Sequence, residues 1–202
     1  MLKLIRKDLL LQKNMLVGML LLLVAAISFT HSTIWVGIVF CVAIIMQMFS
    51  ADEKPSIHLL LNSLPYSRKQ IVGSKYAGAV VIMALFLMTT FLGHFMIYRE
   101  VFPWSQLLFI ACVVFLFISF AFPFSYLFKS QYLFIASGVL FVLYLIIANQ
   151  FVPNLNDILR NFTGSIVSID NHIIYLLVGL GVLLLYLTSW MLSVRIYSKK
   201  VF

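Results

Sequence analysis

D-E-K-P-S-I-H-L-L-L-N-S-L-P-Y-S-R-K-Q-I-V-G-S-K-Y, residues 52–76, is the longest polar interruption in an otherwise apolar chain. Pro55 suits the first turn of a helix, whereas Pro65 cannot lie inside one, so a short helix is expected over about residues 56–64. Four apolar residues share one face of that helix, at Ile57, Leu60, Leu61 and Leu64. The opposite side is polar, with Ser56, His58, Asn62 and Ser63. The pattern predicts a short amphipathic helix at a membrane surface.

Composition places the rest of the chain in a membrane. With 63% hydrophobic and 10% charged residues, the 202-residue chain carries too few charges to solvate a globular surface. Long uncharged intervals separate the charged clusters, and a span needs roughly 20 apolar residues. We therefore predict an all-α, polytopic membrane protein whose six transmembrane helices cover residues 14–31, 34–51, 70–97, 104–127, 131–151 and 172–194. Residues 1–202 then form a single membrane domain with no soluble catalytic module.

The basic residues predict the orientation. Of the 14 lysines and arginines, Arg99 and Arg160 alone fall on segments that would face outward if the N-terminus is cytoplasmic. Such a bias is typical of cytoplasmic segments. Both termini and residues 52–76 are therefore expected in the cytoplasm, with the protein in the plasma membrane. Because topology accounts for the net charge of +8, nucleic-acid binding is not expected.

Residues 1–13 are predicted to form an amphipathic elbow helix in the headgroup layer, ahead of the first span. Its expected apolar face consists of Leu2, Ile5 and Leu9, and its wetter side carries Lys3, Arg6, Lys7 and Lys13. A second interpretation is open, in which this segment is only the basic flank that orients the first span.

Two later segments carry local signals. Ser67 and Gln70 have capping-box spacing, so the third span is expected to begin at Arg68. His94, near the outer end of that span, is more simply a hydrogen-bonded interfacial histidine than a proton relay. Residues 152–171 fit either short outer helices or an ordinary surface loop.

The search for catalytic or metal-binding motifs argues against an enzyme. Cys41 and Cys112 lie inside spans with no C-x-x-C spacing, so they are interpreted as small apolar residues. Gly73-Ser74-Lys75 lacks the other features of a phosphate loop. No acidic residue lies in the middle of a predicted span, where ion-driven carriers place a titratable group. If the protein moves a substrate, the energy comes from elsewhere.

The basic N-terminal helix, the six spans and the run D-E-K, L-L-L-N-S-L-P-Y-S-R-K-Q-I-V and S-K-Y together resemble the membrane subunit of type-2 ABC transporters. The similarity is greatest to short Gram-positive permeases that export antimicrobial or amphipathic peptides. It implies a coupling helix at residues 55–64 that fits a groove on an ATP-binding subunit. It also implies that Lys75 and Tyr76 complete the motif.

By this resemblance the contacts with the ATP-binding subunit are expected at Asp52, Glu53, Lys54, Pro55, His58, Leu60, Leu61, Leu64, Pro65, Ser67, Arg68 and Lys69. The implied partners are that ATP-binding subunit, a second permease subunit, identical or not, and membrane lipid. The chain itself is expected to bind no cofactor or metal, with ATP and Mg²⁺ held by the partner.

Two alternatives remain open at this point. A substrate-capture subunit of an ATP-driven vitamin or metal importer has a similar size and usually six spans, and Gly18, Ala25 and Ala26 would be its small-residue docking face. That interpretation leaves the amphipathic helix between spans two and three unexplained. A regulatory membrane protein without transport activity is the other alternative.

Overall fold

The fold was analysed in a computed structural model that describes residues 2–29, 32–52, 67–146, 155–167 and 172–199. Every regular element in these ranges is an α-helix, which confirms the all-α prediction. The helices are α1 (Leu2–Leu11), α2 (Lys13–Phe29), α3 (Thr33–Asp52), α5 (Arg68–Tyr98), α6 (Trp104–Leu127), α7 (Ser130–Ile146), α8 (Leu155–Val167) and α9 (His172–Lys199).

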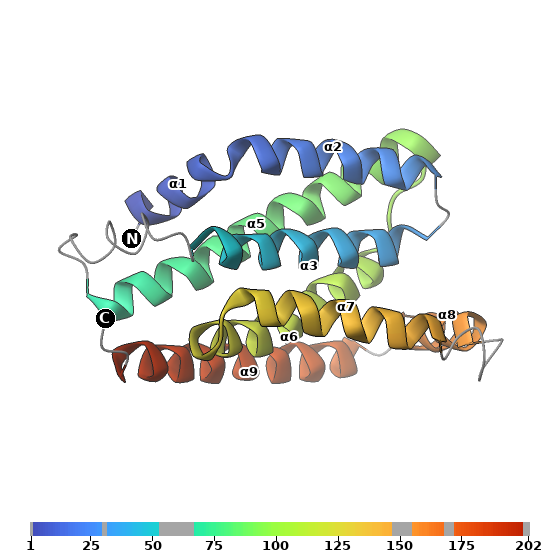
Figure 1. The fold of residues 1–202 in the computed structure, drawn as a ribbon. Coiled ribbons are helices and arrows are strands. Elements are labelled where there is room, and N and C mark those ends of the chain that lie inside the picture. The colour runs from blue at the N-terminus through green and yellow to red at the C-terminus, as the bar shows by residue number, and fades with distance from the viewer. Residues whose placement is uncertain (1, 30–31, 53–66, 147–154, 168–171, 200–202) are drawn as a thin grey trace.

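The helices form an elongated bundle in which α5 runs obliquely from one end to the other (Figure 1). α5 packs against α1, α2, α3, α6 and α9, and the largest helix–helix interface is between α6 and α9. The two chain termini, the end of α3 at Asp52 and the start of α5 at Arg68 gather at one end (Figure 1). We call this the terminal end of the bundle.

Three helices are long and apolar enough to cross a membrane on their own, namely α5, α6 and residues 175–199 of α9. α1 and α2 together make a fourth candidate, bent by 64° at their junction. The apolar part of α3, Thr33–Phe49, and α7, with 17 residues, are shorter. At 1.5 Å per residue, 17 residues span about 26 Å of a hydrocarbon core about 30 Å thick. The prediction of six spans therefore stays a prediction.

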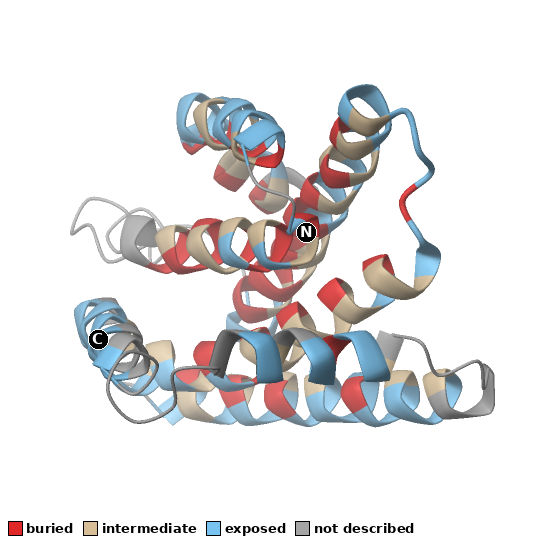
Figure 2. Cartoon of the chain, turned by 90° about the vertical axis from the view of Figure 1, so that its right-hand side faces the viewer, coloured by how far each residue is buried: buried red, intermediate tan, exposed pale blue. Residues whose placement is uncertain are grey.

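The outer surface of the bundle is apolar. Large side chains such as Leu21, Phe120 and Leu184 are more than half exposed, and the buried residues line the facing sides of the helices (Figure 2). A water-soluble protein rarely exposes apolar area of this extent. The chain is thus a multi-pass membrane protein.

Close packing at the centre depends on a small residue. A methyl group added at Gly37 of α3 would lie 3.1 Å from Ile110 Cδ1 of α6 and 3.6 Å from Thr90 Cγ2 of α5. Close helix approach in membranes depends on such small residues. Gly37 therefore lets α3, α5 and α6 meet at one point.

The structure shows which residues at the start of the chain face the bundle. They are Leu4, Asp8 and Gln12, at i, i+4 and i+8. Ile5 and Leu9, from the predicted apolar face of Leu2, Ile5 and Leu9, are half-buried. The position of that face in the headgroup layer stays a prediction.

The structure answers two further expectations, one about residues 152–171 and one about His94. α8 shows that residues 155–167 of the predicted outer segment form a helix rather than a surface loop. His94 Nδ1 lies 3.1 Å from Thr33 Oγ1, which confirms that this histidine is hydrogen-bonded.

Arg99 ends α5 in the left-handed region, with φ 58° and ψ 18°. A residue with a Cβ pays about 1–2 kcal/mol for that conformation, and glycine does not. We expect Arg99→Gly to raise the free energy of unfolding in detergent by about 1 kcal/mol. Glu100→Gly is the control, because Arg99 is the sole described non-glycine residue with positive φ. An equal gain from both variants would contradict this explanation.

Candidate functional site

The first turns of α5 follow directly after the predicted coupling segment. Ser67 Oγ accepts a hydrogen bond from the Gln70 backbone N–H at 3.3 Å, and the Ser67 N–H donates to Gln70 Oε1 at 3.1 Å. This is a complete capping box, as predicted, and it satisfies backbone donors that a helix start would otherwise leave without partners. The start of α5 at Arg68 is thereby fixed. We call residues 67–76 the α5 entry.

Arg68 joins the α5 entry to the last turn of α9. Its guanidinium donates to the backbone carbonyl of Ser198 at 2.7 Å and to that of Tyr197 at 3.3 Å. The last carbonyls of a helix lack intrahelical partners and carry partial negative charge, so a cation is favourable there. Arg68 therefore closes the end of α9 and holds it against α5.

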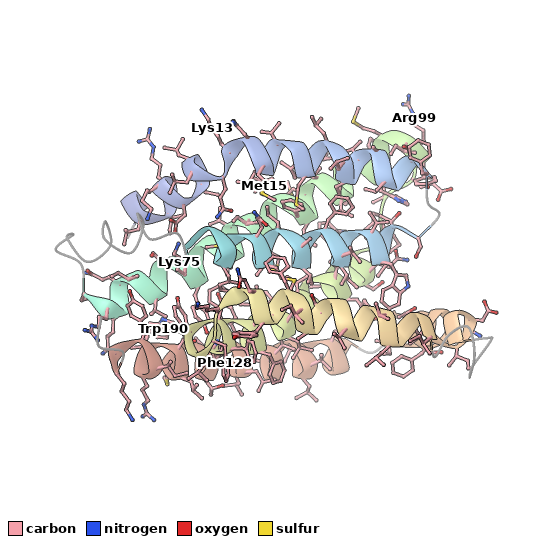
Figure 3. The ribbon with its side chains drawn as sticks, in the orientation of Figure 1. Lys13, Met15, Lys75, Arg99, Phe128 and Trp190 are labelled. Atoms are coloured by element: carbon pink, nitrogen blue, oxygen red, sulfur yellow. The ribbon has the colours of Figure 1, made fainter. Side chains whose placement is uncertain are left out.

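Lys75 joins the α5 entry to α1. Its Nζ lies 2.8 Å from Asp8 Oδ2, and both residues are buried, at 5% and 7% exposure. Lys7, on the same helix as Asp8, lies 3.4 Å from the other carboxylate oxygen and is more exposed. Figure 3 places the labelled Lys75 inside the bundle rather than on its surface. A lysine that the sequence assigns to a cytoplasmic flank is thus one half of an internal ion pair.

Tyr76 joins the α5 entry to the middle of α9. Its hydroxyl lies 2.7 Å from Ser189 Oγ and 2.8 Å from Ser193 Oγ. Ser189 in turn donates to the backbone carbonyl of Ser119 in α6, at 2.7 Å. Each hydroxyl has one proton to donate. The hydrogen bonds therefore all run in one direction: Ser193 donates to Tyr76, Tyr76 donates to Ser189, and Ser189 donates to the Ser119 carbonyl.

Pro123 explains why that carbonyl needs a donor. In a regular helix the carbonyl of Ser119 accepts from the N–H of residue 123, but proline has no N–H. A backbone carbonyl left without a partner inside a bilayer costs several kcal/mol. α6 nevertheless continues to Leu127, because Ser189 of the neighbouring helix supplies the missing hydrogen bond. Pro123 thus lies inside α6, four residues before its last residue.

A scan against protein-family models matches residues 3–198 to the family described as ABC-2 family transporter protein. The chain belongs to this ABC-2 family. The match covers nearly the whole chain, and membership implies in general an ABC-type ATP-binding partner for the permease. No characterised protein and no solved structure gives a significant match.

Of the residues expected to contact the partner of the ABC-2 permease, the structure describes those at the edges of the motif, and their partner contacts stay predictions. Asp52 is the last residue of α3, Ser67 is the N-cap of α5, Arg68 contacts α9, and Lys69 is exposed. The remaining expected contacts lie outside the described residues: Glu53, Lys54, Pro55, His58, Leu60, Leu61, Leu64 and Pro65.

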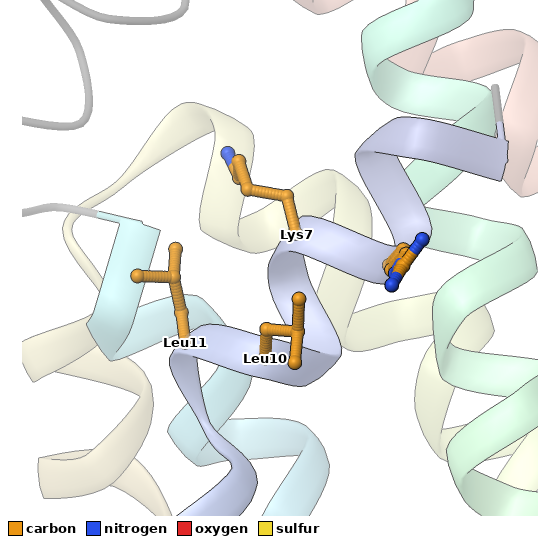
Figure 4. A pocket seen from close by; sticks show the side chains of 4 residues that line it. Lys7, Leu10 and Leu11 are labelled. Carbon is orange, nitrogen blue, oxygen red and sulfur yellow. The ribbon is translucent and has the colours of Figure 1, made fainter.

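The described part of the permease holds no group of three or more potential metal ligands. A depression of about 380 Å³ lies on α1, next to its junction with α2, and is lined by Arg6, Lys7, Leu10 and Leu11 (Figure 4). A single helix lines it, and Leu10 and Leu11 are more than half exposed. Its place on the outside of the bundle fits the headgroup contact expected of an elbow helix.

Asp8, Ser119, Ser189 and Ser193 were missed by the sequence analysis. For each of them, the sequence contains a weak indication of its role. Asp8 is the one acidic residue among the basic residues of the first helix, and Ser189 and Ser193 are spaced i, i+4 in an apolar helix. Ser119 lies four residues before a proline, which is the position whose carbonyl a proline releases.

Proposed function

We propose that this chain is the membrane-spanning permease subunit of an ATP-driven exporter. The cargo is an amphipathic or antimicrobial peptide, or another hydrophobic compound, which is moved out of the cell. The observation that carries the proposal is the ABC-2 family match over residues 3–198. Within the proposal, ATP and Mg²⁺ bind to the partner subunits, and this chain pairs with a second permease subunit, identical or related.

The proposed mechanism begins at the coupling helix of residues 55–64. Closure of the ATP-binding subunits around ATP pushes this helix, whose apolar face carries Leu60 and Leu64. The push reaches α5, whose capped N-terminus follows three residues after Leu64. α5 has 31 residues and crosses the whole bundle, so movement at the terminal end is carried to the opposite end.

The start of α5 is well suited to receive a push. Three contacts tie residues 68–76 to their neighbours: Arg68 to α9, Lys75 to α1, and Tyr76 to α9. Flexible attachment would dissipate the movement of a short helix, whereas a helix fixed by charged and polar contacts transmits it. These contacts support the proposal because they lie within three turns of the predicted coupling segment.

Leu60→Ala combined with Leu64→Ala tests the coupling helix. We expect this variant to insert normally but to lose binding to a co-expressed ATP-binding cassette subunit, because an apolar anchor seated in a groove dominates such interfaces. The measurements are co-purification and export of a fluorescently labelled amphipathic peptide from proteoliposomes. Ser56→Ala with Ser63→Ala, on the other face, is the matched control. Normal co-purification and normal export by the leucine variant would overturn the proposed coupling helix.

The predicted orientation has its own test. In a background with Cys41→Ala and Cys112→Ala, a membrane-impermeant maleimide should label His58→Cys or Asn62→Cys only after the cells are opened. The reason is that the basic residues place this segment in the cytoplasm. Arg160→Cys, on a segment expected outside, is the matched positive control. Labelling of position 58 in intact cells would place the coupling helix on the wrong face and exclude the exporter.

A further inference from the structure

The ion pair between Asp8 and Lys75 connects two segments that are distant in the sequence. Asp8 lies in α1 and Lys75 in the third turn of α5, and their charged atoms are 2.8 Å apart. Both residues are more than nine-tenths buried. They are the one described acid–base pair in which both partners are buried.

Stability alone is a poor explanation for such a pair. Removing two charges from water costs about as much as their attraction returns, and apolar residues of similar volume are often equally stable or more so. A buried ion pair does restrict geometry, however, because its two side chains meet at only one relative position of the two helices. Its best-supported use is therefore to fix the register of one helix on another.

A second attachment, at the opposite end of the bundle, joins α5 to α2, the helix that follows α1. The hydroxyl of Tyr98, in the last turn of α5, donates to the backbone carbonyl of Ile27 in α2 at 3.0 Å. Between these points, Gly93 of α5 allows Ile27 to pack closely, since an added methyl group would lie 3.4 Å from Ile27 Cδ1. The α1–α2 pair is thus attached to α5 near both of its ends.

The backbone continues across the junction of α1 and α2. The Gln12 N–H donates to the Asp8 carbonyl at 3.3 Å, and the Leu16 N–H donates to the Gln12 carbonyl at 2.8 Å. Both bonds involve Gln12, the single residue between the two helices, so helical hydrogen bonding continues up to each side of the 64° bend. α1 and α2 are therefore connected without a loop.

We propose that Asp8 and Lys75 are positioning residues that lock α1 onto the α5 entry, so that α1, α2 and α5 move as one body. The transport part of this inference rests on the proposed function, in which residues 55–64 push α5. The pair then gives the elbow helix a defined part in coupling. Movement delivered to α5 reaches α2 through Asp8 as well as through direct helix packing.

The test is an apolar pair of similar shape, Asp8→Leu with Lys75→Met, compared with the exchanged pair, Asp8→Lys with Lys75→Asp. We expect the apolar pair to insert, bind the ATP-binding subunit and hydrolyse ATP like the wild type. The amount of labelled amphipathic peptide exported per ATP should fall about fivefold or more, because coupling energies typically lie in that range. The exchanged pair should recover part of this ratio. An unchanged ratio in the apolar pair would overturn the proposal.

A distance measurement tests whether Asp8 and Lys75 hold α1 against α5, and it does not depend on a transport assay. Spin labels at Leu10→Cys in α1 and Lys69→Cys in α5, in the cysteine-free full chain in nanodiscs, should give a narrow distance distribution in the wild type. The distribution should broaden in the apolar pair, whereas labels at Lys69→Cys and Leu192→Cys, which report α5 against α9, should not change. Equally narrow α1–α5 distributions would overturn the lock. Failure of the wild type to bind the ATP-binding subunit would overturn the proposed function and leave this result valid.

Discussion

Lys75→Met alone is expected to lower the free energy of unfolding of the permease by about 3–5 kcal/mol, because it leaves the Asp8 carboxylate buried without its closest partner. Lys75 Nζ and Asp8 Oδ2 are 2.8 Å apart, and the two residues are 5% and 7% exposed, respectively. Lys7, at 3.4 Å, lies at the edge of the bundle and cannot replace a buried ammonium group. Thermal unfolding of the purified protein in detergent measures the loss.

Two further variants make this prediction specific. Lys7→Ala removes the more exposed contact of Asp8 and should cost less than about 1 kcal/mol, as partly exposed ion pairs do. Adding Asp8→Leu to Lys75→Met should recover most of the loss, since no buried charge remains. If the single Lys75 variant were as stable as the wild type, the ion pair would not be buried in the way described.

Ser189→Ala should lower the free energy of unfolding by about 2 kcal/mol, because it leaves the Ser119 carbonyl without a donor in a water-free environment. The contact is short, at 2.7 Å, and Ser189 is 6% exposed. Thermal unfolding in lipid nanodiscs is the appropriate measurement, since lipid around the protein excludes a substitute water.

The proline supplies a rescue experiment for this prediction. In a Pro123→Ala background, residue 123 regains its N–H and can donate to the Ser119 carbonyl within α6. Ser189→Ala should then cost about 0.5 kcal/mol, and the two substitutions should be non-additive by more than 1 kcal/mol. Thr188→Ala, on the exposed side of α9, is the control for a change of helix propensity. Strict additivity would show that Ser189 does not compensate for the proline.

Local signals in the sequence predicted local structure well. The capping box at Ser67 and Gln70 needs residues only three positions apart, and the structure has it in full. The histidine at position 94 was correctly interpreted as hydrogen-bonded, although its partner, Thr33, could not be named. The all-helical fold was likewise predicted, since a chain in a membrane must satisfy its backbone hydrogen bonds internally.

Contacts between distant helices could not be predicted. α6 is apolar on all sides, so no amphipathic stripe indicates that α9 is its main neighbour. The Asp8–Lys75 pair joins segments 67 residues apart in a chain with few charges, and sequence analysis treated Lys75 as part of a cytoplasmic flank. The burial of Asp8 could not be predicted for the same reason, because its partner lies on a distant helix.

The position of α9 has a consequence for how the protein is made. α9 is synthesised after α5 and α6, yet it provides the hydroxyl groups that bind Tyr76 of α5 and the Ser119 carbonyl of α6. Segments nearer the N-terminus generally fold first during synthesis. Until α9 is in place, α5 and α6 therefore carry polar groups that lipid cannot satisfy. We expect a protein truncated before residue 186 to be degraded faster than one that contains α9, because these groups then lack their partners on α9.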